Sequence, residues 1–437
     1  MMDLSFYKNK KILITGHTGF KGSWMCKALL LAGAEITGYA LMPPTEPSLF
    51  AVMGLFGEEK EGNSNKKTEN GNSLSAVNHP VSGAIVKEEE RKGGSSESES
   101  NEESCEYFVQ MDQGTLRTVI GDVCDLAALK KVFEEAQPEI VIHMAAQPIV
   151  RESYRNPVGT YETNVMGTVN VLECIRLFDS VKSFVNVTTD KVYLNREWDW
   201  GYRENEELNG YDPYSNSKSC SELVTSSYRN SFFGGEAGRR ANGNPIAITT
   251  MRAGNVIGGG DFAADRIIPD CIRSVEKQEE ITVRNPYSTR PYQHVLEPVM
   301  AYLMVAARQY EDTSLAGCYN VGPDDADCYT TGNIVDLFCE CWNRSSGSSA
   351  YKAGWRNVAE EGAPHEANFL KLDCAKLKKT FGWKPVWNLE TAMEKIVEWS
   401  VIFLDAPEDV TNQILLCMQR QIEQYSSATQ SPTFLRE

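Results

Sequence analysis

Short apolar runs alternate with segments of helical periodicity through the first 250 residues of the chain. The strand-like runs lie at 11–15, 35–40, 118–120, 139–144, 183–188 and 246–251. The helix-like segments lie between them at 23–32, 126–136, 158–179 and 213–230. Because nearly continuous apolar strands joined by helices are typical of a parallel sheet covered on both faces, the pattern predicts an α/β fold with a Rossmann-like, doubly wound sheet.

This pattern changes in two places. Beyond residue 255 it loosens into short strands, loops and helices, which predicts a Rossmann-like domain at 1–254 and a smaller C-terminal α+β lobe at 255–437, with the chain crossing between them. Residues 57–106 contain no aromatic residue and carry twelve Glu against six Lys and Arg. Because such a segment cannot bury enough surface to offset its ordering entropy, we expect a disordered surface loop that interrupts the first domain.

A glycine-rich turn directly follows the first strand and opens the first helix. Gly16, Gly19 and Gly22 are spaced three residues apart, with Phe20 and Lys21 between the last two. Glycines at such a turn let the backbone approach a pyrophosphate, and the helix N-terminus then meets the negative charge. The turn therefore predicts a dinucleotide site.

The second and third strands carry weaker signals for the adenosine end of such a ligand. No acidic residue follows the second strand before Glu46, so the usual cue that separates NAD from NADP is missing. Asp122 and Val123 follow the third strand, where we expect contact with the adenine. Asp125 precedes a helix, and we interpret it as an N-cap rather than a ligand contact.

Two polar groups of residues are expected at the carboxyl edge of the sheet. Thr188 and Thr189 end the strand at 183–188, and Asp190 and Lys191 follow at once. In the next helix Tyr214 and Lys218 lie four residues apart, and therefore on one face. A nearby ammonium lowers the pKa of a phenol, so this tyrosine is a candidate base for an alcohol or sugar hydroxyl.

The composition narrows the possible partners. The net charge of −17 argues against binding of nucleic acid or of an anionic membrane surface. No apolar run reaches 18 residues, and the N-terminal segment lacks an apolar signal core, so we expect a cytoplasmic protein. Twelve cysteines without a CxxC pair and five dispersed histidines predict reduced thiols and no metal site.

Several sequence blocks together resemble one family. They are TGHTGFKGSW (15–24), HMAAQPIVR (143–151), TNVMGT (163–168), GYDPYSNSK (210–218), MRAGNVIGGGD (251–261) and RNPYSTRPYQHVLEP (284–298). With them the chain resembles the extended short-chain dehydrogenases/reductases of the nucleotide-sugar 4,6-dehydratase group, and within it the branch that acts on CDP-glucose. The resemblance covers nearly the whole chain except 57–106, a segment that the family generally lacks.

The resemblance implies NAD as the cofactor and a nucleotide sugar as the substrate. It places a further set of cofactor contacts along the nicotinamide, at Ala145, Ala146, Gln147, Thr163 and Asn164, beside Thr188, Tyr214 and Lys218. It also implies a set of substrate contacts that continues into the C-terminal lobe, at Gln147, Arg151, Asn255, Arg266, Arg284, Arg290 and His365. By the same resemblance we expect a homodimer or a homotetramer.

The chemistry that the resemblance implies has three steps. Tyr214, with Lys218 and Thr189, takes a proton from the 4-hydroxyl while NAD accepts the C4 hydride. Water then leaves across C5–C6 with Asp190 as general acid, and the hydride returns to C6. Lys191 stands where most of the group has a glutamate base, as in the CDP-glucose branch. It is either a neutral base at C5 or a partner of the enolate, with water carrying the proton.

Three other functions remain as alternatives to CDP-glucose dehydration. The first is a dehydratase for GDP-mannose or dTDP-glucose. The second is a 4-epimerase, which needs no acid/base pair after the strand threonine, so Asp190 argues against it. The third is a non-catalytic nucleotide-sugar sensor, which is expected to have lost Tyr214 or Lys218, whereas both are present.

Overall fold

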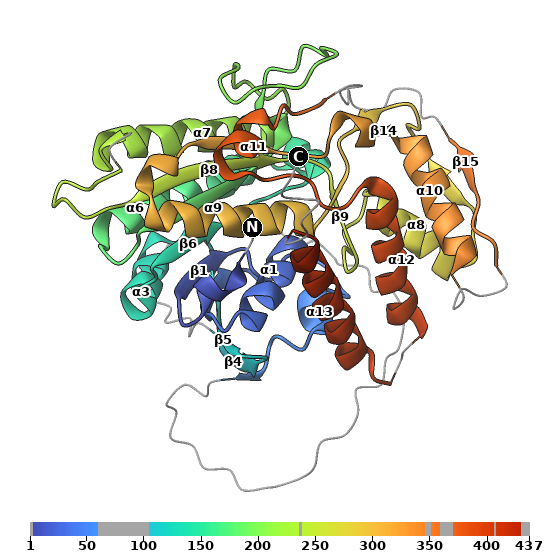
Figure 1. Cartoon of the computed structure of the whole chain (residues 1–437), viewed down its shortest axis with the longest axis horizontal. Helices are drawn as coiled ribbons and strands as arrows, with labels where there is room; N and C mark the ends of the chain where they lie inside the picture. The colour runs from blue at the N-terminus through green and yellow to red at the C-terminus, as the bar shows by residue number, and fades with distance from the viewer. Residues whose placement is uncertain are drawn as a thin grey trace, which may run out of the picture.

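The computed structural model describes residues 3–59, 105–235, 238–345, 351–358, 370–405 and 408–429. Its centre is a nine-stranded sheet with the order β13-β8-β7-β6-β1-β2-β5-β4-β3 (Figure 1). Neighbours from β13 to β5 pair in parallel, whereas β4 pairs antiparallel with both β5 and β3. The predicted α/β fold with a doubly wound, mostly parallel sheet is confirmed.

The central strands are buried on both faces, as their apolar sequences predicted. All six positions of β7 and all four of β6 are buried. The strands of the sheet are β1 (Lys11–Thr15), β2 (Glu35–Ala40), β3 (Glu58–Glu59), β4 (Glu106–Met111), β5 (Gly114–Ile120), β6 (Ile140–His143), β7 (Ser183–Thr188), β8 (Ala247–Ala253) and β13 (Cys318–Val321).

Helices cover the sheet on each side. One core contains Leu13 with residues of α3 (Leu126–Ala136) and α6 (Gly167–Leu177). The other contains Ile12 and Ile14 with residues of α1 (Phe20–Leu31), α9 (Leu296–Glu311) and α13 (Val410–Ala428). Successive side chains of a strand point to opposite faces, so adjacent residues of β1 feed different cores. The remaining helices near the sheet are α2 (Leu49–Val52), α4 (Val150–Arg155), α5 (Pro157–Tyr161), α7 (Pro213–Phe232) and α11 (Ala375–Phe381).

A smaller unit lies beside the sheet, on the right of Figure 1. Its core joins α8 (Ile267–Glu276), α10 (Thr331–Arg344) and α12 (Leu389–Asp405) with β10 (Ile281–Val283), which pairs with β15 (Trp355–Asn357). The chain from 255 onward also returns to the main sheet, because β13 pairs with β8 and α9 packs on β7. The boundary at 254/255 stays a prediction. The short strands of this half are β9 (Val256–Ile257), β11 (Thr289–Arg290), β12 (Gln293–His294) and β14 (Tyr329–Thr330).

The structure differs from the sequence prediction in three places. The predicted loop is too wide at its ends, because β3 and the first residue of β4 belong to the sheet, while 60–104 lies outside the described residues. The sequence analysis missed β4, which is partly exposed at every position and so lacks a clear apolar run. The long helix predicted at 158–179 is interrupted by a π-helical turn at Glu162–Met166.

Within the described ranges, no helix is both long and apolar enough to cross a bilayer. The same ranges contain no group of three or more His, Cys, Asp or Glu side chains arranged to hold a metal ion.

Candidate active site

The glycine-rich turn lies between β1 and α1, and two of its glycines are sterically required. A Cβ on Gly16, whose φ is +74°, would lie 2.7 Å from the backbone N of Ala145, and one on Gly22 would lie 2.5 Å from the carbonyl oxygen of Gly16. Gly19 is the N-cap of α1 and has no side chain to cap the helix. The first backbone N–H groups of α1 are therefore available to an anionic ligand.

Lys21, in the first turn of α1, lies within electrostatic range of groups on other elements. Burial and the Arg266 guanidinium lower the pKa of Lys21 to about 8, whereas the Asp190 carboxylate raises it. The side chain therefore connects the glycine-rich turn to the residues that follow β7. Phe20 begins α1 beside it and is packed against the core that contains α1.

Asp190 lies two residues beyond the end of β7 and carries a buried carboxylate. The residue is 1% exposed, and its Oδ1 accepts a 2.8 Å hydrogen bond from Thr189 Oγ1. Its Oδ2 has no hydrogen-bond partner among the described residues. A Cβ at position 254 would lie 2.0 Å from this oxygen, so only glycine fits opposite it. A buried, unpartnered carboxylate oxygen is costly, which marks it as a contact point for a ligand.

Tyr214 lies near Thr189 and Asp190, and both act on its hydroxyl. It lies in the first turn of α7, where Asp212 caps the helix by accepting from the backbone N of Ser215 at 3.0 Å. The Thr189 side chain lies close enough to the Tyr214 hydroxyl to lower its pKa. Burial raises the pKa of Tyr214 to about 12, the Asp190 carboxylate raises it further, and Thr189 and Arg266 lower it. In the structure without ligands the phenol is therefore protonated at neutral pH.

Lys218 lies one helical turn beyond Tyr214 and is 4% exposed. Its Nζ donates to the carbonyl oxygen of Val187 at 3.3 Å. Burial and the charge of Lys21 lower the pKa of Lys218 to about 7, while Glu222 raises it. The sequence analysis expected this lysine to lower the pKa of Tyr214, but burial of the phenol outweighs such an effect.

Lys191 follows Asp190 in the 3-10 helix η3 (Asp190–Val192) and is half-buried. Its backbone N–H donates to Thr189 Oγ1 at 3.4 Å. Thr188, by contrast, points into the protein, where its hydroxyl donates to Glu222 Oε1 at 2.5 Å. Of the four residues predicted at the end of β7, Thr188 therefore points into the interior. The other three, Thr189, Asp190 and Lys191, lie beyond the carboxyl end of the strand.

The predicted nicotinamide contacts are held together by Asn164, on the π-helical turn. Its Oδ1 accepts from the backbone N of Gln147 at 2.8 Å, and its Nδ2 donates to the Gln147 carbonyl at 3.1 Å and to Ser217 Oγ at 2.9 Å. The amide of Gln147 bonds Thr160, and the backbone N of Ala145 donates to Thr15 Oγ1 at 3.2 Å. These bonds position the segment 145–147, which contains Ala146, against α7.

The predicted adenosine contacts lie after β5. Asp122 is exposed and accepts from the backbone N of Cys124 at 2.9 Å, and Val123 is buried against Gly167. Thr163 is hydrogen-bonded to Cys124. Asp125 accepts from the backbone N of Ala128 at 3.0 Å and caps α3, so the N-cap interpretation is confirmed.

The predicted substrate arginines form two groups. Asp265 Oδ1 bridges Arg151 and Arg284, at 3.4 and 3.1 Å from the nearest nitrogen of each. Arg266 pairs with Asp261 at 2.9 Å and also acts on Tyr214 and Lys21. The other three predicted substrate contacts belong to neither group. Arg290 is buried on β11, and Asn255 has a φ of +38° and a buried Nδ2 without a partner among the described residues. His365 lies outside the described residues.

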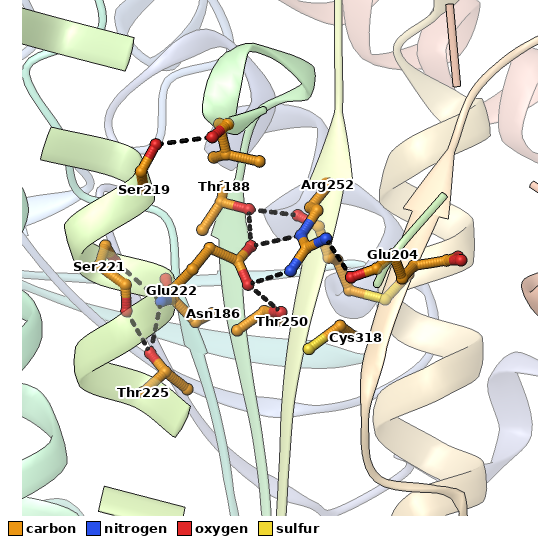
Figure 2. A network of polar contacts seen from close by, with 12 residues as sticks. Asn186, Thr188, Glu204, Ser219, Ser221, Glu222, Thr225, Thr250, Arg252 and Cys318 are labelled. Atoms are coloured by element: carbon orange, nitrogen blue, oxygen red, sulfur yellow. Dashed lines mark hydrogen bonds and ion pairs between the residues drawn. The ribbon is translucent and has the colours of Figure 1, made fainter. Parts of the chain in front are cut away.

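Sequence reasoning missed a buried ion pair that involves the same helix, α7, as Tyr214 and Lys218. Glu222 on α7 faces Arg252 on β8, with 2.9 Å between Oε2 and Nη2 (Figure 2). The available signal for Glu222 was its place on the helix, four residues after Lys218. Arg252 lay within a quoted sequence block, but pattern alone does not pair residues 30 positions apart.

Comparison with known proteins identifies the class to which this fold and site correspond. The family model described as GDP-mannose 4,6 dehydratase matches residues 87–396. The chain belongs to this family of nucleotide-sugar dehydratases, which confirms the predicted family. Over 430 residues it is 41% identical to the CDP-glucose 4,6-dehydratase of Salmonella typhimurium, covering 98% of this chain and 99% of that protein. The dTDP-glucose 4,6-dehydratase of the same organism is 26% identical over 298 residues, covering 64% of this chain and 76% of that protein.

Solved structures show the same fold. The dTDP-glucose 4,6-dehydratase of Bacillus anthracis, in complex with NAD, aligns with a TM-score of 0.62 at 17% identity, covering 92% of this chain and 99% of that one. The UDP-glucose 4-epimerase of Thermotoga maritima, with UDP-glucose, aligns with a TM-score of 0.61 at 19% identity, covering 89% and 97%.

Proposed function

We propose that this protein is an NAD-dependent lyase that converts CDP-glucose to CDP-4-keto-6-deoxyglucose. The observation that carries the proposal is the grouping of Tyr214, Thr189 and Asp190: Thr189 acts on the Tyr214 phenol and donates a hydrogen bond to Asp190, whose other carboxylate oxygen has no partner among the described residues. It places a candidate base and a candidate acid side by side at the carboxyl edge of a parallel sheet, where such folds bind ligands. The near-full-length similarity to the Salmonella CDP-glucose 4,6-dehydratase supports the choice of nucleotide.

The residues of the glycine-rich turn fit a dinucleotide. Gly16 and Gly22 leave no room for side chains, and the uncapped N-terminus of α1 at Gly19 offers backbone N–H groups to a pyrophosphate. Lys218, with a pKa near neutrality, is suited to hold a ribose hydroxyl. When bound, NAD supplies the chemistry of accepting a hydride at C4 and returning it at C6.

Tyr214 removes the proton of the 4-hydroxyl. Because burial raises its pKa to about 12, the phenol needs cationic neighbours before it can act as a base. Arg266 lowers the pKa of Tyr214. The positive charge of an oxidised nicotinamide would add to this effect if the ring bound beside the phenol. Thr189 also lowers the pKa of Tyr214 and so assists the phenol as a base.

Asp190 is a carboxylate during the oxidation, so it first takes up the proton released from the 4-hydroxyl and then delivers a proton to the departing 6-hydroxyl, which leaves as water. Its Oδ1 is held by Thr189, which leaves Oδ2 to face the substrate. The 4-ketone acidifies the hydrogen at C5, and Lys191 serves this step either as a neutral base or by stabilising the enolate while water carries the proton. Arg151 and Arg284 hold the diphosphate, for which planar guanidinium groups are suited.

The test is incubation of the purified protein with NAD and each of CDP-glucose, dTDP-glucose and GDP-mannose. Formation of a 4-keto-6-deoxy sugar is measured by mass spectrometry, since the product has lost one water. We expect turnover with CDP-glucose at least about tenfold above the other two, because a buried base contact discriminates strongly. Preference for another nucleotide contradicts the substrate assignment, and epimerised CDP-sugar without loss of water contradicts the reaction.

A homodimer or homotetramer is part of the proposal. Large apolar side chains are exposed on α6 and α7, at Leu177, Leu223 and Phe232. Apolar side chains on neighbouring helices are typical of an interface between subunits. Light scattering of the purified protein measures the mass, and a monomer over the working concentration range contradicts this part of the proposal.

A further inference from the structure

The carboxylate of Glu222 is held by four short contacts inside the protein. Oε1 accepts from Thr188 Oγ1 at 2.5 Å and from Arg252 Nε at 3.0 Å. Oε2 accepts from Thr250 Oγ1 at 2.6 Å and from Arg252 Nη2 at 2.9 Å. Figure 2 shows the carboxylate between α7 and the strands β7 and β8. Since Glu222 and Arg252 are each 2% exposed, the carboxylate is locked in one orientation.

Arg252 extends the network toward the edge strand β13, whose Asn320 is its register partner. Its Nη1 donates to the hydroxyl of Tyr193 at 2.7 Å and to the Glu204 carbonyl at 3.0 Å. The Tyr193 hydroxyl donates to Asn320 Oδ1 on β13 at 2.7 Å. Four of the five N–H donors of the guanidinium therefore have an acceptor in this network, two of them on Glu222.

The network touches the proposed active site in two ways. Glu222 follows Lys218 by four residues on α7, as Lys218 follows Tyr214, so the three share one helix face. Glu222 also binds the hydroxyl of Thr188, the residue directly before Thr189. We propose that Glu222 is a positioning residue that keeps Lys218 charged and holds the end of β7 in register with α7. This inference rests on the proposed function for its catalytic meaning.

Three charged or titratable groups act on Lys218 from the elements around it. Lys21 on α1 repels the ammonium and lowers its pKa, whereas Glu222 raises it. His143 on β6 is electrostatically coupled to Lys218, but burial lowers the pKa of the imidazole to about 3, so it is neutral. Glu222 therefore opposes the effect of Lys21 and favours the charged form of Lys218.

The experiment measures the titration of Lys218 directly. Protein labelled with ¹³C at the lysine ε-carbon is titrated by NMR, and the Lys218→Met variant assigns the signal. Because Glu222→Gln alone leaves a buried guanidinium unpaired, the charge is removed as a pair, in Glu222→Gln/Arg252→Met and separately in Glu222→Gln/Arg252→Gln. We expect the Lys218 midpoint to fall by about one pH unit or more in either double variant that folds.

Glu297→Gln is the matched control. Glu297 on α9 is also a carboxylate buried to 1% exposure, but it binds Tyr425 and the backbone of Val386 and Trp387. We expect this variant to leave the Lys218 midpoint unchanged. A midpoint that stays at the wild-type value in the double variants overturns the proposal, and so does an equal shift in the control.

A second readout relates the titration to catalysis. The alkaline limb of the pH profile of CDP-glucose turnover is expected to move to lower pH in the double variants, by the shift that NMR measures. An unmoved limb contradicts the positioning role. Absence of any CDP-glucose turnover in the wild-type protein refutes the proposed function instead, and the NMR titration still decides whether Glu222 sets the charge of Lys218.

Discussion

Replacing Asp190 by Asn separates the oxidation at C4 from the loss of water. The change keeps the size of the side chain and an oxygen that can accept from Thr189, but it removes the proton that the 6-hydroxyl needs on leaving. General acid catalysis contributes about 10²- to 10⁴-fold to such a step, and we expect elimination to slow by that factor. Oxidation at C4 is expected to continue, so reduced cofactor and a 4-keto-glucose nucleotide accumulate.

The same substitution changes the pKa of Tyr214 in a defined direction. The Asp190 carboxylate raises that pKa, because a negative charge disfavours a phenolate. Removing the charge therefore lowers it, and the pH at which Tyr214 becomes an effective base falls. We expect the pH profile of C4 oxidation in Asp190→Asn to move to lower pH by about one unit, which is about 1.4 kcal/mol at the phenol.

The assay is a single turnover in stopped flow, with the absorbance of reduced nicotinamide as the signal for oxidation and mass spectrometry for loss of water. Wild-type protein is expected to show only a transient signal, because the hydride returns to C6. In the variant the signal is expected to persist. If Asp190→Asn loses the first hydride transfer as well, Asp190 acts on binding or on Tyr214, and the assignment as general acid is wrong.

Four further outcomes are expected. Tyr214→Phe is expected to slow C4 oxidation by about 10²- to 10⁴-fold at unchanged thermal stability, and near wild-type turnover contradicts its role as base. Lys191→Met is expected to reduce solvent deuterium exchange at C5, whereas Asp190→Asn retains it; equal exchange in both removes Lys191 from this step. Gly254→Ala is expected to abolish turnover, because its Cβ would lie 2.0 Å from Asp190 Oδ2, and a crystal structure with an unmoved carboxylate refutes that reasoning. Deleting 60–104 with a short Gly/Ser replacement is expected to preserve turnover, since loop length changes closure entropy slowly, and loss of folding contradicts this.

Much of the fold followed from local patterns in the sequence. The strands at 35–40 and 183–188 and the helix at 126–136 match β2, β7 and α3 to the residue, because apolar continuity, flanking breakers and an Asp N-cap are local signals. The strand β4 was missed because each of its residues is partly exposed, so it carries no apolar run that a local pattern could show. The π-helical turn at Glu162–Met166 was missed because tertiary contacts of Asn164 stabilise it.

Some features of the candidate site likewise followed from local sequence, and others did not. The glycine spacing and the Tyr214–Lys218 pair are local features, so the sequence by itself determined them and the chemistry that they indicate. Only the tertiary structure decided that Lys21 reaches Asp190, that Glu222 meets Arg252, and that burial raises rather than lowers the pKa of Tyr214. The physical reason is that charge interactions and desolvation depend on distance and burial in space, which a linear pattern does not contain.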